Sequence, residues 1–130
     1  MSLEIYHETI LAHYNNPGNS GVISDADVIS KDNNPVCGDV VEIQVKFNGE
    51  RIDEIKFQGQ GCAISLASVD ILIDAIKGKT VDQIKNFRQE DFLKLLGIEI
   101  SPLRLKCALL GLKVLKTGVY SYLDNNTEST

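Results

Sequence analysis

The segment Val41–Phe47 alternates apolar and polar residues, which is the pattern of a β-strand with one buried face. Asn48-Gly49 follows directly, and this pair is the strongest short signal for a hairpin turn. Ile55–Phe57 then predicts a strand that returns antiparallel, and Val28-Ile29 predicts a weaker third strand. The centre of the chain is therefore expected to form a small antiparallel sheet, whose apolar face needs a covering layer.

The periodicity changes to that of helices on both sides of this sheet. Before it, Leu3–Tyr14 carries a short apolar stripe at helical spacing and stops at the turn cluster Asn15–Asn19. After it, Ala63–Lys77 is apolar around most of its circumference and is followed by Gly78, a frequent helix stop. This second segment predicts a helix that is buried on most sides.

Three shorter signals complete the predicted architecture. Thr80–Gln83 matches a capping box, and Phe92–Leu96 predicts a short helix. Ser101-Pro102 is typical of an N-cap followed by the first helical residue, and the helix that follows is expected to end near Leu123. The predicted fold class is α+β, with a small three-stranded antiparallel sheet and helices packed on one of its faces. Residues 124–130 are expected to form a frayed tail.

Length, charge and cysteine content exclude several classes of protein. The 130 residues predict a single domain, 1–130, and the net charge of −5 argues against nucleic-acid binding. No stretch approaches the roughly 18 apolar residues of a membrane span, and the N-terminus lacks the pattern of a signal peptide. Three cysteines in such a chain do not make a disulfide framework. We therefore predict a cytoplasmic protein with free thiols and no membrane or nucleic-acid partner.

The three cysteines fall at the ends of predicted elements. Cys37 precedes the alternating strand, Cys62 stands at the mouth of the buried helix, and Cys107 lies in the early turns of the last helix. Because Cys37 enters one strand of a hairpin and Cys62 leaves the other, the two thiols are expected at the same end of the sheet. Asp39 follows Cys37 by two residues and can direct its carboxylate to the same point.

Three thiolates and one carboxylate can bind Zn²⁺ tetrahedrally or occupy the four outer positions of a two-iron cluster. Gly38 and Gly61 lie beside two of these residues and allow the backbone to bend toward a metal. The N-terminus of a helix also favours the thiolate form of Cys62, which is the species that binds metal.

The residues alone leave simpler interpretations open. Free cysteines are often buried in the core, and the separations of 25 and 45 residues match no zinc-finger spacing. Asp39 could equally be a solvated turn residue. His7 and His13 do not share one face of the first helix and are expected at the surface, which leaves little support for a thiol hydrolase with a Cys–His pair.

Four motifs together resemble the IscU/NifU family of iron–sulfur cluster assembly proteins. The resemblance covers His13 to about Val114, most of the chain, and is specific as a set. The motifs are His13-Tyr14-Asn15-Asn16-Pro17-Gly18-Asn19, Asn34-Pro35-Val36-Cys37-Gly38-Asp39, Phe57-Gln58-Gly59-Gln60-Gly61-Cys62-Ala63-Ile64-Ser65 and Arg104-Leu105-Lys106-Cys107-Ala108.

The resemblance implies the fold predicted above and a scaffold role rather than an enzyme. It implies that Cys37, Asp39, Cys62 and Cys107 hold a transient iron–sulfur cluster of the two-iron, two-sulfur (2Fe-2S) type, or a zinc ion. The sulfur would come from a cysteine desulfurase, and the cluster would pass to apo iron–sulfur acceptor proteins. Within the family the cysteine that receives the persulfide differs, and it corresponds here to Cys37 or to Cys107.

Two departures from the IscU pattern are similar to the SufU branch, whose members bind zinc and accept sulfur. Lys106 stands where IscU-type members have a histidine, and the segment Ser101–Lys106 lacks the paired prolines that an Hsp70-type chaperone system recognises. An Hsp70-type partner is therefore not expected. SufU members carry an insertion between the last two cysteines, and the separation of 45 residues in this chain leaves little room for one. A zinc-dependent sulfur acceptor that forms no cluster is thus the alternative to the scaffold.

Overall fold

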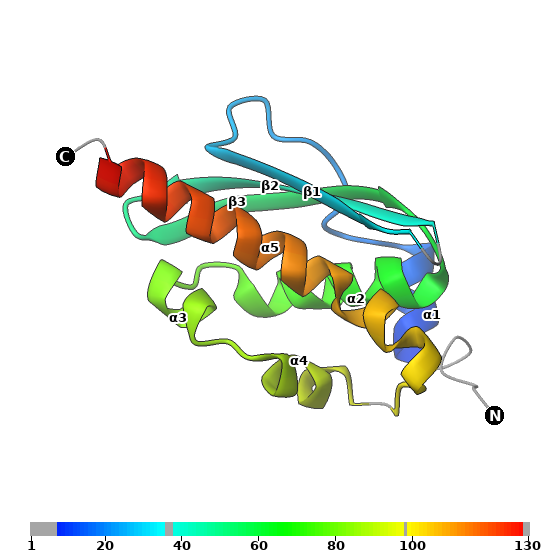
Figure 1. The fold of residues 1–130 in the computed structure, drawn as a ribbon. Coiled ribbons are helices and arrows are strands. Elements are labelled where there is room, and N and C mark those ends of the chain that lie inside the picture. Colours follow the sequence, from blue (N-terminus) through cyan, green and yellow to red (C-terminus); the bar gives the residue numbers. More distant parts are fainter. Residues whose placement is uncertain (1–7, 36–37, 98, 129–130) are drawn as a thin grey trace.

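The computed structural model describes residues 8–35, 38–97 and 99–128 of the chain. It consists of a three-stranded antiparallel sheet and five helices, arranged in two layers (Figure 1). In chain order the elements are α1 (Glu8–Asn15), β1 (Val28–Asn34), β2 (Asp39–Asn48), β3 (Arg51–Gln60), α2 (Ala63–Ile76), α3 (Val81–Lys85), α4 (Gln89–Leu96) and α5 (Pro102–Glu128).

The sheet has the strand order β1-β2-β3, and both pairs of neighbours are antiparallel. The hairpin predicted at Asn48-Gly49 is confirmed, because Asn48 pairs directly with Arg51 across a two-residue loop. All three predicted strands exist, and each is longer than its apolar pattern indicated. β1 in particular continues to Asn34, because its polar residues still pair with β2; they alternate between half-buried and exposed, and Asn34 at the end is buried.

The helices cover one face of the sheet, as predicted. In Figure 1 the sheet lies at the top, α2 and α5 cross below it, α3 lies beyond the C-terminal end of α2, and α4 lies farther from the sheet. The apolar side chains of β2 contribute Val41, Ile43 and Val45 to the core, where they are almost completely buried. Leu72 and Ile76 of α2 are fully buried, which confirms that this helix lies inside the protein rather than on its surface.

The capping box predicted at Thr80 is present at the start of α3. Thr80 Oγ1 accepts the Gln83 amide at 3.2 Å, and the Gln83 side chain accepts the Thr80 amide at 2.9 Å. The prediction for α4 began too late, because α4 starts at Gln89 rather than at Phe92. An Asp91 carboxylate oxygen accepts the amide of Arg88 at 2.9 Å and so satisfies the backbone at this end of the helix.

Two further boundaries differ from the predictions. α5 begins at Pro102 as expected but continues to Glu128 instead of ending near Leu123, because no glycine or proline after Gly118 interrupts it. α1 is described from Glu8 onward, so the predicted start of the first helix at Leu3 lies outside the described residues. No helix in the described part of the chain is both long enough and apolar enough to cross a membrane.

Two glycines allow α5 to approach the rest of the protein closely. A Cβ atom on Gly111 would lie 2.7 Å from Cγ2 of Val69 in α2. A Cβ on Gly118 would lie 2.9 Å from side-chain atoms of both Val28 and Ser30 in β1. The glycines that weaken the helix on propensity are therefore the residues that let it pack against α2 and β1.

The first prediction concerns this close packing. We expect Gly111→Ala to lower the free energy of unfolding by about 1–2 kcal/mol, because the clash with buried Val69 outweighs the better helix propensity of alanine. Thr117→Ala, an exposed substitution in the same helix, is the control and should change stability by less than about 0.5 kcal/mol. Urea denaturation measures both, and equal or greater stability of Gly111→Ala would contradict the packing described here.

Candidate metal centre

The register of the sheet brings Asp39 and Cys62 together. Asp39 is the first residue of β2 and pairs with Asn34, the last residue of β1. Val40 pairs with Gln60, the last residue of β3, so the chain leaves β3 beside the start of β2 and reaches Cys62 two residues later. The predicted meeting of these segments at one end of the sheet is confirmed for Asp39 and Cys62.

The third group comes from α5. Cys107 lies in the second turn of this helix and is 2% exposed, and the ligand atoms of Asp39, Cys62 and Cys107 all lie within 4.8 Å of one another. Such a spacing allows a single metal ion to contact all three. Cys37, the fourth predicted ligand, lies outside the described residues.

The Asp39 carboxylate is oriented for a further ligand. Its Oδ1 atom accepts the backbone N–H of Cys62 at 3.1 Å, and the residue is 1% exposed. Its Oδ2 atom is buried and has no hydrogen-bond partner among the described residues. A Cβ atom on Gly61 would collide with this carboxylate, so glycine is required at that position. A buried oxygen without a donor, beside two thiols, fits a bound metal cation.

Cys62 is the N-cap residue of α2, as its position in the sequence predicted. Its Sγ atom accepts the backbone N–H of Ser65 at 3.5 Å, the hydrogen bond that a serine or aspartate commonly accepts at an N-cap. Cys62 is also half-buried rather than fully enclosed, which leaves its sulfur within reach of a partner.

Asn34 contacts the site but was not predicted as a site residue. It is 6% exposed, and its Nδ2 atom lies 4.0 Å from Cys107 Sγ, at the limit of a hydrogen bond to sulfur. Hydrogen bonds of this kind orient a metal ligand and adjust its basicity. The available signal was the position of Asn34 in the motif that contains Asp39, but that signal does not show which sulfur the amide faces.

The donor set is compatible with zinc and with iron–sulfur chemistry. Thiolates are soft ligands that select Zn²⁺ and iron–sulfur clusters, whereas a carboxylate is harder and exchanges more readily. Because the groups come from β2, from the start of α2 and from α5, metal binding at this point links three distant parts of the chain.

A second polar cluster lies between α1 and α2, and it corrects the prediction that His13 is a surface residue. His13 Nδ1 lies 2.6 Å from a carboxylate oxygen of Asp70, and the histidine is 26% exposed. Asn19 donates to Asp70 through its backbone and its side chain, both at 3.0 Å, and to Asp74 at 2.9 Å. This network holds α1 and the following turn on α2. Because Asp70, not a thiol, binds His13, the Cys–His hydrolase hypothesis gains no support.

With this geometry established, the chain can be compared with known proteins. Residues 5–129 match the NifU-like N-terminal domain family, so the match spans nearly all of the chain. The protein belongs to this family. The resemblance inferred from the four sequence motifs is thereby confirmed.

Two curated relatives are similar over most of their length. The zinc-dependent sulfurtransferase SufU of Bacillus subtilis is 36% identical over 88% of this chain and 89% of its own. The iron-sulfur cluster assembly scaffold protein IscU of Aquifex aeolicus is 34% identical over 95% of this chain and 78% of its own. The SufU relative and the IscU relative thus have similar sequence identity to this chain, in agreement with the mixture of SufU-like and IscU-like features in the sequence.

Solved structures have the same fold. A protein from Fervidobacterium islandicum, described as an iron-sulfur cluster assembly scaffold for the SUF system, superposes with a TM-score of 0.79 and 31% identity over 92% of this chain and 99% of its own. An N-terminal NifU-like protein from Brucella abortus gives a TM-score of 0.77 over 93% of this chain and 96% of its own. The second protein is 17% identical, and its likeness supports the fold alone. The predicted α+β class is confirmed.

The second prediction tests the shared site. Zinc added to the metal-free protein at about a hundred times its dissociation constant should raise the melting temperature by roughly 10 °C, because binding free energy becomes folding free energy. The quantity compared is the rise in melting temperature that zinc causes in each protein, because Cys62→Ala and Cys107→Ala also change the stability without zinc. Both variants should lose most of this zinc-induced rise. Asp53→Ala, which removes an exposed carboxylate from β3, should retain it. An undiminished increment in either cysteine variant would contradict the shared site.

Proposed function

We propose that this protein is an iron–sulfur cluster assembly scaffold. It accepts sulfur from a cysteine desulfurase, holds the nascent cluster as its cargo on Cys37, Asp39, Cys62 and Cys107, and passes the cluster to acceptor proteins. The observation that carries the proposal is the convergence of Asp39, Cys62 and Cys107 within 4.8 Å in a member of the NifU-like family. Cys37 completes the set on the strength of its motif, two residues before Asp39.

The ligand set is suited to a cargo that must leave again. Thiolates bind iron strongly, and the carboxylate of Asp39 is the weaker ligand. One oxygen of this carboxylate, Oδ1, also accepts the backbone N–H of Cys62. Asp39 can therefore release a metal while it keeps one hydrogen bond, which lowers the cost of exposing a coordination position to an acceptor.

The two described thiols differ in burial, and this difference indicates the side from which a partner reaches the site. Cys107 is enclosed by the core, whereas Cys62 is half-buried at the surface end of α2. Gly38 has a φ of 76°, a left-handed backbone conformation directly before Asp39. An incoming desulfurase or acceptor thus approaches from the Cys62 side, and Cys107 anchors the cargo from within.

The alternative is a zinc-dependent sulfur acceptor on which no cluster forms. The B. subtilis relative is named a zinc-dependent sulfurtransferase, and Lys106 in place of histidine beside Cys107 offers no further imidazole ligand to a cluster. In this case the metal would hold the thiols in place and activate one of them for sulfur transfer. Both functions would use the same residues, so they differ in what the site holds and not in which site is used.

The third prediction tests the scaffold against this alternative. Anaerobic reconstitution with ferrous iron, cysteine, a cysteine desulfurase and a thiol reductant, which supplies the two electrons that convert each persulfide sulfur to sulfide, should give the visible absorption of an iron–sulfur cluster, with iron and sulfide bound in equal amounts. Asp39→Ala should still bind the cluster and should lose it severalfold more slowly in air, because the exchangeable ligand has been removed. Asp53→Ala should decay at the wild-type rate.

The opposite result identifies the alternative. If the metal is a resident zinc ion, no visible band develops, and Asp39→Ala loses zinc faster than the unmodified protein because a coordination position is opened. That combination of results would overturn the scaffold proposal.

The fourth prediction concerns the receiving thiol. The Cys37 thiolate attacks the outer sulfur of the desulfurase persulfide, the S–S bond breaks, and the desulfurase cysteine leaves as a thiolate. Cys37 is favoured over Cys107 because Cys107 is 2% exposed. After one turnover with labelled cysteine, mass mapping should locate the extra sulfur on Cys37. Cys37→Ser should abolish this label, and label on Cys107 in the unmodified protein would overturn the assignment.

A further inference from the structure

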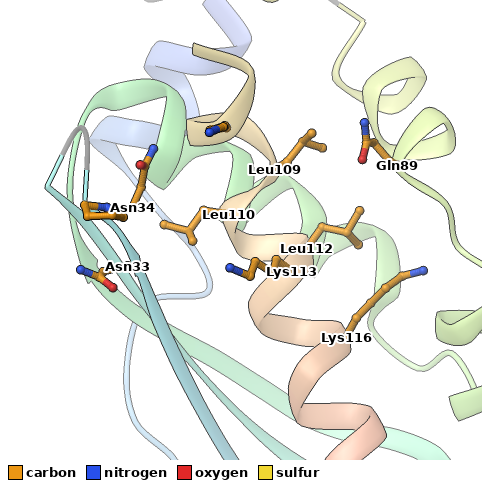
Figure 2. Close-up of a pocket in the computed structure, with 10 residues that line it drawn as sticks. Asn33, Asn34, Gln89, Leu109, Leu110, Leu112, Lys113 and Lys116 are labelled. Atoms are coloured by element: carbon orange, nitrogen blue, oxygen red, sulfur yellow. The ribbon is translucent and has the colours of Figure 1, made fainter. Parts of the chain in front are cut away.

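A groove with a volume of about 600 Å³ runs along the outer side of α5, between the C-terminal end of β1 and the start of α4 (Figure 2). Its apolar surface comes from Leu109, Leu110 and Leu112, three nearly consecutive residues of α5. A cavity of this size is within the usual range for ligand sites. The groove is separate from the ligand atoms of the metal centre, although Asn34 lines it and also contacts Cys107.

Three lysines of α5 surround this apolar surface: Lys106, Lys113 and Lys116. The chain as a whole carries a net charge of −5, so the groove is a local cationic region on an acidic protein. Lys106 is exposed, and no hydrogen bond or ion pair to it is found within the described residues.

The other two lysines have partners at the rim of the groove. Lys113 Nζ lies 2.9 Å from the Asp32 carboxylate, and this hydrogen bond lowers the pKa of Asp32 below its ordinary value. Lys116 donates to the backbone oxygen of Lys85 at 3.4 Å. Both pairs are exposed, so an incoming carboxylate can compete for either ammonium group at little cost.

The spacing of the lysines indicates an extended ligand. Lys106 and Lys113 are separated by two helical turns, or roughly 10 Å along the axis, and Lys116 lies roughly 15 Å from Lys106. A single phosphate or carboxylate spans only a few ångströms and cannot reach both ends of this row. A peptide segment whose acidic residues lie roughly 10–15 Å apart can reach both ends.

We infer that this groove is a docking site for a partner protein, which inserts a segment combining apolar side chains with carboxylates. The leucines take up the apolar side chains, and the lysines pair with the carboxylates and fix the direction of the segment. A nucleic acid fits less well, because its backbone offers no apolar groups to the leucine surface and would be repelled by the rest of this acidic chain. This inference does not depend on which cargo the metal centre holds.

The position of the groove links docking to the metal centre. Asn34 lines the groove at the end of β1, and its amide faces Cys107 Sγ. A segment seated beside Asn34 therefore contacts the residue that orients a metal ligand, without itself touching the ligand atoms. The groove would thus bring a partner to the cysteine end of the sheet.

A random peptide library displayed on phage, selected against the intact protein, tests the inference. The enriched sequences should combine Leu, Ile or Phe with Asp or Glu, and a synthetic peptide of the best sequence should shift the amide resonances of Leu109, Lys113 and Asn34. Its affinity, measured by fluorescence anisotropy, should fall with rising salt. The affinity should also fall by roughly tenfold in the double variant Lys106→Glu/Lys116→Glu.

Matched controls separate charge and fold from docking. Lys94→Glu reverses an exposed charge on α4 that does not line the groove and should leave the affinity unchanged. Lys106→Glu alone breaks no hydrogen bond or ion pair within the described residues, so its melting temperature should equal that of the unmodified protein while its affinity falls. The inference is overturned if no sequence is enriched, or if the enriched peptides lack acidic residues. It is equally overturned if binding is unaffected by Lys106→Glu, or if sedimentation shows that a second copy of this chain occupies the groove.

Discussion

The hydrogen bond from the Cys62 amide to the Asp39 carboxylate joins the first residue of β2 to the first turn of α2, and the functional end of the molecule depends on it. It forms because the antiparallel register returns the chain from Gln60 to the start of β2, and because Gly61 leaves space for the carboxylate. The second oxygen of Asp39 is buried and has no hydrogen-bond partner among the described residues, and the carboxylate lies within 4.8 Å of the sulfur atoms of Cys62 and Cys107. One hydrogen bond thus connects the start of β2 to the start of α2 and holds the carboxylate of Asp39, a candidate metal ligand, in place.

The position of Cys107 depends on a different constraint, the close approach of α5 to the rest of the fold. Gly111 lies against Val69 of α2, and Gly118 lies against β1. A side chain at either position would lie less than 3.0 Å from these neighbours, so the helix or the neighbouring side chains would have to shift. Residues that lower helix propensity therefore allow the close packing that places Cys107 near the other candidate metal ligands, and the cost to the helix is offset by that packing.

One helix, α5, serves the metal centre with one face and the groove with another. Cys107 faces inward, and Lys106 and Lys113 border the opposite side with Leu109 between them. Asn34 lies at the junction, because the last residue of β1 lines the groove and also faces Cys107. A partner docked on the outer side would be held next to the end of the sheet where cargo is assembled, while the ligand atoms remain covered from that side.

The sequence by itself determined the elements and the chemistry of this protein. The alternation of Val41–Phe47, the apolar run after Cys62 and the glycine stops predicted the sheet and the buried helix, because these patterns are local. The motifs around Cys37, Cys62 and Cys107 indicated the family and gave the candidate metal ligands. Only the tertiary structure showed that His13 pairs with Asp70, that Asn34 faces Cys107, and that three lysines border one apolar groove. Those contacts join residues distant in the chain, and their geometry depends on how closely α5 packs against the sheet, which no local pattern specifies.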